Sequence, residues 1–466
     1  MKTIKRRKMS AVPQCLAVLA LLSSIAFLPS CNLGTHSRGG VSGQTLSSTY
    51  TVFAWNDLGM HCLNPTYDKA VILPPYNTVW VQVVKRGTPP EIVTAGLTVE
   101  YALVHNTSSS NKRSYGQFWA NAGPLFGAAG LAPDKGLNLE DPAIHNGLSG
   151  TMLVKGNHFQ ANGIPAVPVF DSGVWSPFQQ IAVTVRDAGG NVVATTRAMV
   201  PTSDEINCAK CHGNGTVDSA FDNILQKHDT LSGTSLIASQ PVLCASCHGS
   251  PALGTTGPGT SALYLSRAIH GFHATEGATC YDCHPGNVTQ CSRSTAHTAA
   301  NGNCTSCHGS MGNVADSIAN GGRIPWANEP ACGSCHTASS SATLTAVSAG
   351  AVSTIAQVDT GTSLYRNSTG HGGVSCAACH SSPHAMVPSR EANDNYQAVQ
   401  YQGKAVTIGS CAACHDTSHG GGFGEFFDEH GGGGDGETSA CKVCHTGFSA
   451  GASASSAPHQ FQWRSR

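Results

Sequence analysis

Eight copies of the motif Cys-x-x-Cys-His lie in the second half of the chain. A Cys-x-x-Cys pair alone fits half of a zinc ribbon or a redox-active dithiol, whereas His directly after it is typical of covalent haem attachment. A zinc ribbon has no use for a fixed His after each cysteine pair. In haem attachment all three residues act, because the thiols form thioethers to the porphyrin and the imidazole becomes the proximal iron ligand. The repetition favours eight covalently bound haem c groups, with iron as the metal.

The motif residues divide into two sets by their chemistry. The predicted thioether cysteines are Cys208, Cys211, Cys244, Cys247, Cys280, Cys283, Cys304, Cys307, Cys332, Cys335, Cys376, Cys379, Cys411, Cys414, Cys441 and Cys444. The predicted proximal iron ligands are His212, His248, His284, His308, His336, His380, His415 and His445.

The same half contains eight further histidines, one for each predicted haem. The other common axial ligand is Met, and this half has only Met311 and Met386. Two histidines per iron is therefore the economical interpretation for all eight haems. The candidate distal ligands are His228, His270, His273, His297, His371, His384, His419 and His430.

Helical periodicity supports one of these candidates. In SAFDNILQKHD (219–229), Phe221, Leu225 and His228 follow a single helical stripe, which directs His228 toward the core. A histidine that merely packs in the core is the alternative.

Close spacing indicates that some distal histidines serve a haem other than the nearest one. His270 and His273 share a helix face and cannot both complete an iron that already has a motif His, so we expect them at two neighbouring haems. His384 lies only four residues after His380, so we expect it to reach a different haem.

Two distal candidates lie in glycine-rich sequence and have competitors. His419 and His430 could be replaced by His459 in the tail, by His61 in the first half, or by a ligand from a second subunit.

The chain changes character near residue 203. Six short β-rich runs precede that point, TYTVFAW, NTVWVQVVK, LTVEYALVH, GTMLVKG, QQIAVTVRD and NVVATTRAMV, with a hairpin turn at DAGGN (187–191). They predict an all-β, sandwich-like domain, followed by a mostly irregular, loop-rich multihaem domain with short α-helices, in which haem fills the core. The expected divisions are a signal peptide at 1–31, a flexible linker at 32–48, the β domain at 49–203, the haem domain at 204–446 and a flexible tail at 447–466.

The first residues read as an export signal. A cationic start is followed by a short apolar run and LPSC at 28–31. Cys31 stands where a lipidated cysteine would, which predicts a lipid anchor to an outer membrane, and simple cleavage after Ala26 is the alternative. The chain has 26 basic and 27 acidic residues and no basic stripe, so we expect no nucleic-acid partner.

Two cysteines remain outside both the motifs and the signal. Cys62 and Cys291 are candidates for one disulfide that ties the two halves together, since an exported chain meets an oxidising compartment. Two unpaired buried thiols are the alternative.

Several stretches carry a family resemblance. LCASCHGSPALG, AIHGFH and CYDCHPGNVTQC, within eight haem motifs, resemble the multihaem (octahaem) c-type cytochromes of metal-reducing bacteria, and FAWNDLGMHC (53–62) is similar to a start motif of exported proteins that accompany them. The resemblance implies extracellular or outer-membrane electron transfer, with a periplasmic, outer-membrane or extracellular location. The implied partners are redox proteins or extracellular acceptors, and some relatives assemble into filaments.

Three functions compete at this point. An electron-transfer protein fits fully ligated irons and needs no catalytic residues. A multihaem oxidoreductase acting on a small inorganic substrate needs one open haem site, and no motif departs from Cys-x-x-Cys-His to mark one. A binding or structural role would use the β domain, where Trp55, Trp80, Trp119 and Trp175 line a surface or, more commonly, fill a core.

Overall fold

The computed structural model describes residues 46–416 except 88, 255–263, 287, 296, 298–303, 331–335, 339–343, 347–363 and 370–372. For His336–Ala338, Leu344–Ala346 and Cys411 it describes the backbone alone. All described residues belong to one compact unit, Thr45–Arg466. The expected signal, most of the linker, the end of the haem domain and the tail lie outside the described residues.

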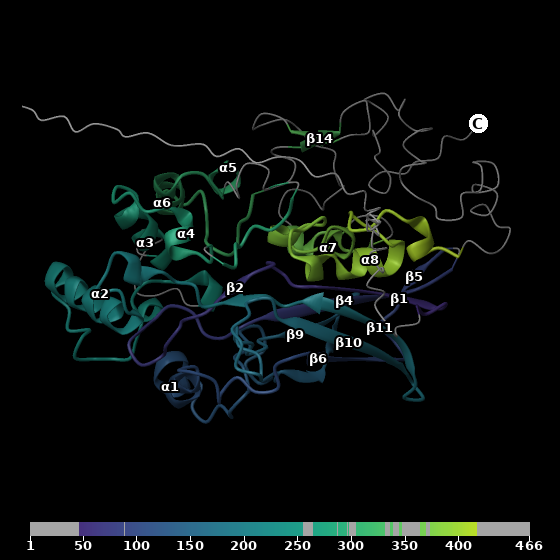
Figure 1. Cartoon of the computed structure of the whole chain (residues 1–466), viewed down its shortest axis with the longest axis horizontal. Helices are drawn as coiled ribbons and strands as arrows, with labels where there is room; N and C mark the ends of the chain where they lie inside the picture. Colours follow the sequence, from purple (N-terminus) through teal and green to yellow (C-terminus); the bar gives the residue numbers. More distant parts are fainter. Residues whose placement is uncertain are drawn as a thin grey trace, which may run out of the picture. The chain divides into compact units, whose positions relative to one another are not determined.

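Two antiparallel sheets pack face to face in the first half (Figure 1). The first contains β1 (Tyr50–Trp55), β4 (Thr78–Lys85), β9 (His158–Asn162) and β8 (Leu153–Lys155) in that order, with β5 (Glu91–Ile92) also beside β4. The second contains β11 (Val192–Met199), β10 (Gln180–Asp187), β6 (Leu97–Leu103) and β7 (Ser149–Thr151).

The sequence explains how each strand is buried. β10 alternates buried and half-buried residues, as expected for a strand with one face on the core. β1 and β4 instead read as nearly continuous apolar runs, and both of their faces are covered. Val52 and Val81 point into the sandwich, whereas Phe53, Trp55 and Trp80 pack in a different cluster on the outer face.

That outer face of β1 and β4 is covered by the described residues of the expected haem domain, 204–416 with the gaps given above, which are called the haem half below. α7 (Cys376–His380) contacts β1, and α8 (Tyr396–Gln402) contacts β11 (Figure 1). Ala378 and Ile408 join Phe53 and Trp80 in the shared cluster. The expected boundary at 203 thus marks a change of secondary structure, but both sides of it contribute to one core.

Two short parallel strand pairs also join the halves. β2 (His61–Cys62) pairs with β12 (Thr202–Ser203), and β3 (Ala70–Val71) pairs with β13 (Val242–Leu243).

A second cluster extends this contact. It packs the helix α1 (Gly116–Phe126), through Phe118 and Leu125, with Leu243 and Leu253 of the haem half. The sequence interpretation, which found only strands before residue 203, missed α1.

The haem half consists of short helices joined by irregular segments. Besides α7 and α8 these are α2 (Val217–Ser232), α3 (Leu265–His273), α4 (Cys280–Cys283), α5 (Cys304–His308) and α6 (Met311–Ala319), with a small hairpin of β14 (His336–Ala338) and β15 (Leu344–Ala346). Among the described residues between 264 and 330, the buried apolar side chains are Leu265, Pro285, Ala315 and Ile318. So few cannot form a side-chain core of ordinary size.

The predicted helix around His228 is present as α2. It begins at Thr216, whose side chain accepts a hydrogen bond from the Ser219 backbone N–H, and it ends at Gly233 with φ +65°. Phe221 and Leu225 are buried as the stripe predicts, and His228 at the end of the stripe is half-buried.

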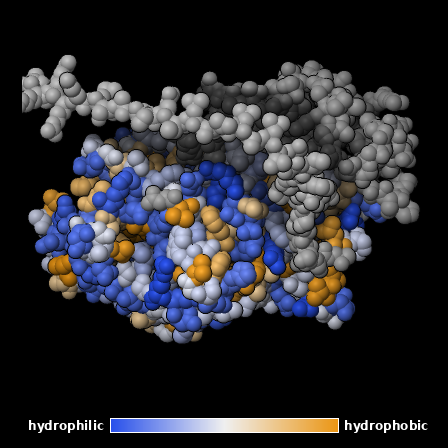
Figure 2. Space-filling view, viewed as in Figure 1, coloured by the Kyte–Doolittle hydropathy of each residue, from blue (hydrophilic) through white to orange (hydrophobic). Residues whose placement is uncertain are grey.

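The surface shown in Figure 2 is mainly hydrophilic, with small apolar patches between. Scattered exposed apolar residues such as Leu153 and Val154 on β8 are ordinary on folded proteins and indicate no partner by themselves.

Candidate haem sites

Each of the six motifs that the structure describes from its first cysteine folds as a single helical turn. These turns start at Cys208, Cys244, Cys280, Cys304, Cys376 and Cys411. In the first three, the backbone N–H of the motif histidine donates to the carbonyl of the first cysteine at 2.9, 2.9 and 2.8 Å. Because residues i, i+3 and i+4 share a helix face, one turn presents both thiols and the imidazole on the same side.

Four motif histidines lie opposite one of the candidate distal histidines. The pairs, with the distances between ring centres, are His212 and His273 at 6.2 Å, His248 and His228 at 6.2 Å, His284 and His270 at 6.1 Å, and His308 and His384 at 6.2 Å.

This constant separation fits two ligands on opposite sides of one metal ion. With metal–nitrogen distances of about 2 Å and about 1.1 Å from nitrogen to ring centre, two such imidazoles have centres about 6.2 Å apart. The angle between the ring planes varies from 16° in one pair to 84° in another. Direct ring contacts depend on mutual orientation as well as distance, so a fixed distance with free orientation favours a shared metal over aromatic packing.

The remaining ring nitrogen of these histidines is hydrogen-bonded. Nδ1 of His270, His273 and His384 lies 2.6, 2.8 and 2.9 Å from the backbone carbonyls of Ser266, Ile269 and Leu58. A carbonyl can only accept, so Nδ1 carries the proton and the lone pair of Nε2 is available to a metal.

Two further rings are oriented through side chains. His228 Nδ1 is 2.9 Å from the Thr234 hydroxyl, and that hydroxyl donates to Asp229 at 2.6 Å, so the imidazole is the donor in the first bond. His212 Nδ1 lies 3.2 Å from Asn223 Oδ1. The site residues therefore fit a haem at these four motifs in ligand type and spacing, and His212 and the four distal histidines also fit in tautomer.

Burial keeps several of these imidazoles neutral, as metal ligands must be. Loss of water around the ring lowers the pKa of His308 to about 4, with the neighbouring His384 adding to the effect, although His308 as a whole is exposed. Burial also lowers the pKa of His270 and of His384, against the opposing effect of their backbone hydrogen bonds.

The pairing crosses from motif to motif. His270 and His273 on α3 lie beside two different motif histidines, and His384 lies beside His308 rather than beside its neighbour in sequence, His380. The sequence analysis expected this arrangement, and the sharing of irons itself stays a prediction.

Neighbouring motifs also touch directly. Lys210 forms an ion pair with Asp282, which joins the first motif to the third. Burial and then the nearby Cys280, which is hydrogen-bonded to it, raise the pKa of the Cys304 thiol to about 11. The motifs at 208–212, 280–284 and 304–308 therefore form a contiguous group.

Other predicted ligands are not assigned to a pair. His297 is exposed, with its Nδ1 3.5 Å from the Ser294 hydroxyl, and we assign it to no motif. His380 is the last residue of α7, and His415 follows the turn that starts at Cys411. The predicted residues outside the described side chains are Cys31, Cys332, Cys335, His336, His371, Cys411, His419, His430, Cys441, Cys444 and His445.

The candidate disulfide residues lie together. Cys62 and Cys291 are both free thiols in the structure. A hydrogen bond from the Cys291 thiol to the Cys62 side chain, together with burial, raises the pKa of the Cys291 thiol. Ser203, which pairs with Cys62, has its hydroxyl 2.9 Å from that of Thr289. This proximity is compatible with a disulfide, which stays a prediction.

The groups that orient the histidines were missed in the sequence. Ser266 and Ile269 precede their histidines by four residues on α3, so the helical spacing alone could have found these two carbonyls. Leu58 is 326 residues away from His384, and no sequence signal indicates that contact.

The four tryptophans serve as core residues. Trp55 and Trp80 are buried between the two halves, and Trp119 and Trp175 pack against the cluster around α1. They therefore do not support the binding-surface alternative.

Among the described residues, no group of three or more His, Cys, Asp or Glu side chains could coordinate a bare metal ion, and no helix is long and apolar enough to cross a membrane. No family model, curated protein or solved structure matches this chain.

Proposed function

We propose that this chain is an electron-transfer protein, an octahaem c-type cytochrome with two histidines on each iron. The proposal rests on the four ring pairs at 6.1–6.2 Å, in which a motif histidine faces a second imidazole. Haem bound at these motifs would supply an iron that changes its charge by one electron.

The arrangement of the histidine side chains favours electron transfer over catalysis. At each of the four pairs, the two imidazoles would hold the iron of a bound haem between them, which would leave no open position for a substrate. Hydrogen bonds to Ser266, Ile269 and Leu58 fix the rings in that orientation. The motif histidine and its partner therefore act as permanent ligands.

Contacts between neighbouring motifs support electron transfer from one haem to the next. α3 carries distal histidines for two motifs, and Cys280 and Cys304 of successive motifs are in contact. His384, next to the motif at 376–380, extends the group toward that motif. Export, outer-membrane or extracellular placement, and redox proteins or extracellular acceptors as partners belong to the same proposal, and the family resemblance supports them.

The test is a haem count combined with ligand deletion. Pyridine-haem and iron analysis of the purified chain should give eight haems, and its electron paramagnetic resonance spectrum should show low-spin iron throughout. His270→Ala and His273→Ala should each create one high-spin, carbon-monoxide-binding haem, and the double variant should create two.

Two results would contradict the proposal. Carbon monoxide uptake by the reduced wild-type protein would reveal an open iron and favour the oxidoreductase. A double variant with a single open haem would show that both histidines belong to one site.

A further inference from the structure

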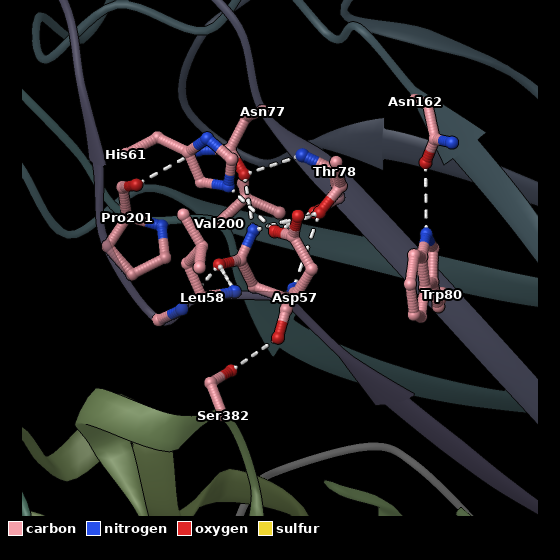
Figure 3. A network of polar contacts seen from close by, with 12 residues as sticks. Asp57, Leu58, His61, Asn77, Thr78, Trp80, Asn162, Val200, Pro201 and Ser382 are labelled. Atoms are coloured by element: carbon pink, nitrogen blue, oxygen red, sulfur yellow. Dashed lines mark hydrogen bonds and ion pairs between the residues drawn. The ribbon is translucent and has the colours of Figure 1, made fainter. Parts of the chain in front are cut away.

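The loop that follows β1, residues 56–62, is fixed by buried hydrogen bonds (Figure 3). Asn56 Nδ2 donates to Asn77 Oδ1 at 2.6 Å, and Asn56 Oδ1 accepts from the Gly59 backbone N–H at 2.6 Å. Asp57 accepts from the Thr78 hydroxyl at 2.5 Å and lies 2.7 Å from His61 Nε2. All these side chains are buried, so the loop has one well-defined conformation.

This loop contacts the turn that carries His384. The Ser382 hydroxyl donates to the Asn56 carbonyl at 2.7 Å. Figure 3 shows Ser382 directed toward the residues of this loop. His384 Nδ1 donates to the Leu58 carbonyl at 2.9 Å. The turn η8 (Pro383–Ala385) and the residue before it are thereby attached to the β-sandwich through the carbonyls of Asn56 and Leu58.

Gly59 makes this close approach possible. Its φ is +84°, and a Cβ at this position would lie 2.9 Å from Ser382 Cβ and 3.4 Å from the backbone N of His384. A side chain there would strain the loop and push the turn away.

The opposite side of the turn is fixed by a buried ion pair. The Arg293 backbone N–H donates to the His384 carbonyl at 2.7 Å. The Arg293 guanidinium donates to both carboxylate oxygens of Asp394, at 2.8 and 3.0 Å. The two side chains are 2% and 1% exposed, so the pair is rigid and completely enclosed.

We propose that Gly59 and the carbonyls of Asn56 and Leu58 are positioning elements that direct His384 to the iron at His308. The β-sandwich thereby sets the ligation of a haem to which it has no covalent link. This inference rests on the proposed bis-histidine ligation, and it gives the FAWNDLGMHC stretch a physical role.

The experiment compares two glycine substitutions in the full-length, haem-loaded protein. Gly59→Ala introduces both backbone strain and the contact with Ser382. Gly96→Ala is the matched control, since Gly96 also has a positive φ, +71°, but a Cβ there would meet nothing within 4 Å. Carbon monoxide uptake by the reduced protein and the high-spin resonance signal are measured for both.

In Gly59→Ala, about one haem iron per chain should lose its second histidine and bind carbon monoxide. In Gly96→Ala, as in the wild type, no haem iron should bind it. His384→Ala should open the same single haem, and the Gly59→Ala, His384→Ala double variant should open no second one. A folded Gly59→Ala protein that binds no carbon monoxide overturns the inference, and so does a double variant with two open haems.

A milder change covers the case in which Gly59→Ala does not fold. Ser382→Ala removes one hydrogen bond from the turn and should give partial carbon monoxide binding, between wild type and His384→Ala. Unchanged binding would overturn the positioning role. If His384→Ala itself opens no haem, the ligand assignment of the proposed function fails instead, so the two failures are distinguishable.

Discussion

The two halves of the molecule fill their interiors differently. The β half encloses a continuous cluster of apolar side chains from both sheets, including Val81, Phe159 and Ile181. Between residues 264 and 330, the buried apolar side chains of the described part of the haem half are Leu265, Pro285, Ala315 and Ile318. In that region histidine pairs take the places where a side-chain core would be. The comparison teaches that two regions of one chain differ in how much core their own side chains supply, and under the proposed function haem would complete the second.

The largest effect should follow from preventing haem attachment. In a haem-free chain, amides of β4, β6 and β10 should keep slow hydrogen exchange, because their core consists of side chains alone. Amides of α3 and α6 should exchange nearly as fast as in an unfolded chain, because too little apolar surface remains buried there. Hydrogen exchange measured by mass spectrometry resolves the two regions. Slow exchange of α3 amides in the haem-free chain would contradict the prediction that this region needs haem to fold.

Removing one core side chain from each half should show that only the haem half couples its packing to haem ligation. Phe159→Ala in the sandwich should cost about 3–5 kcal/mol of unfolding free energy and leave every haem low-spin. Phe221→Ala on α2 should be destabilising too, and should also loosen His228 and so raise carbon monoxide binding. Denaturant unfolding and carbon monoxide titration of both variants test this pair. Equal carbon monoxide binding by the two would argue against it.

A smaller, pH-dependent effect is expected from the buried Asp57. Burial alone would raise the pKa of its carboxyl, but His61 and the Thr78 hydroxyl more than compensate, and the pKa is lowered. A lowered carboxyl pKa contributes stability above the unfolded value, and that contribution is lost as the pH falls through the folded value. Asp57→Asn should therefore cost about 3 kcal/mol at neutral pH, a difference that shrinks below about pH 4.

Thermal unfolding of wild type and Asp57→Asn between pH 7 and pH 3 measures this difference. Groups that titrate in both proteins shift both melting temperatures, so the difference between the two temperatures reports on Asp57. A gap in melting temperature that stays constant over the range would show that the Asp57 charge does not stabilise the fold.

Much of the β half could be predicted from local sequence. The six expected strands are present, and the DAGGN turn does join β10 to β11. One expected strand, GTMLVKG, is divided at Met152, so that β7 belongs to one sheet and β8 to the other. α1 was missed because Gly116, Gly123 and Pro124 disguise its helical pattern.

In the haem half, the sequence predicts candidate ligands but not which of them face each other. The ligand set obtained by counting histidines stays a prediction, whereas the spacing of His270 and His273 indicated the two different neighbouring histidines that the structure places beside them. Which motif each one faces depends on contacts between distant segments, such as His384 with Leu58, and local patterns carry no information about these. The Arg293–Asp394 pair was overlooked for the same reason.

The double burial of β4 has a consequence for how this protein can evolve. Val81 faces the other sheet, whereas Trp80 and Val84 face residues of the haem half. A substitution on the outer side of this strand must be matched by changes more than two hundred positions later in the chain. Exchange of either half with an unrelated sequence would leave a bare apolar surface, so the two parts are expected to be inherited and to diversify together.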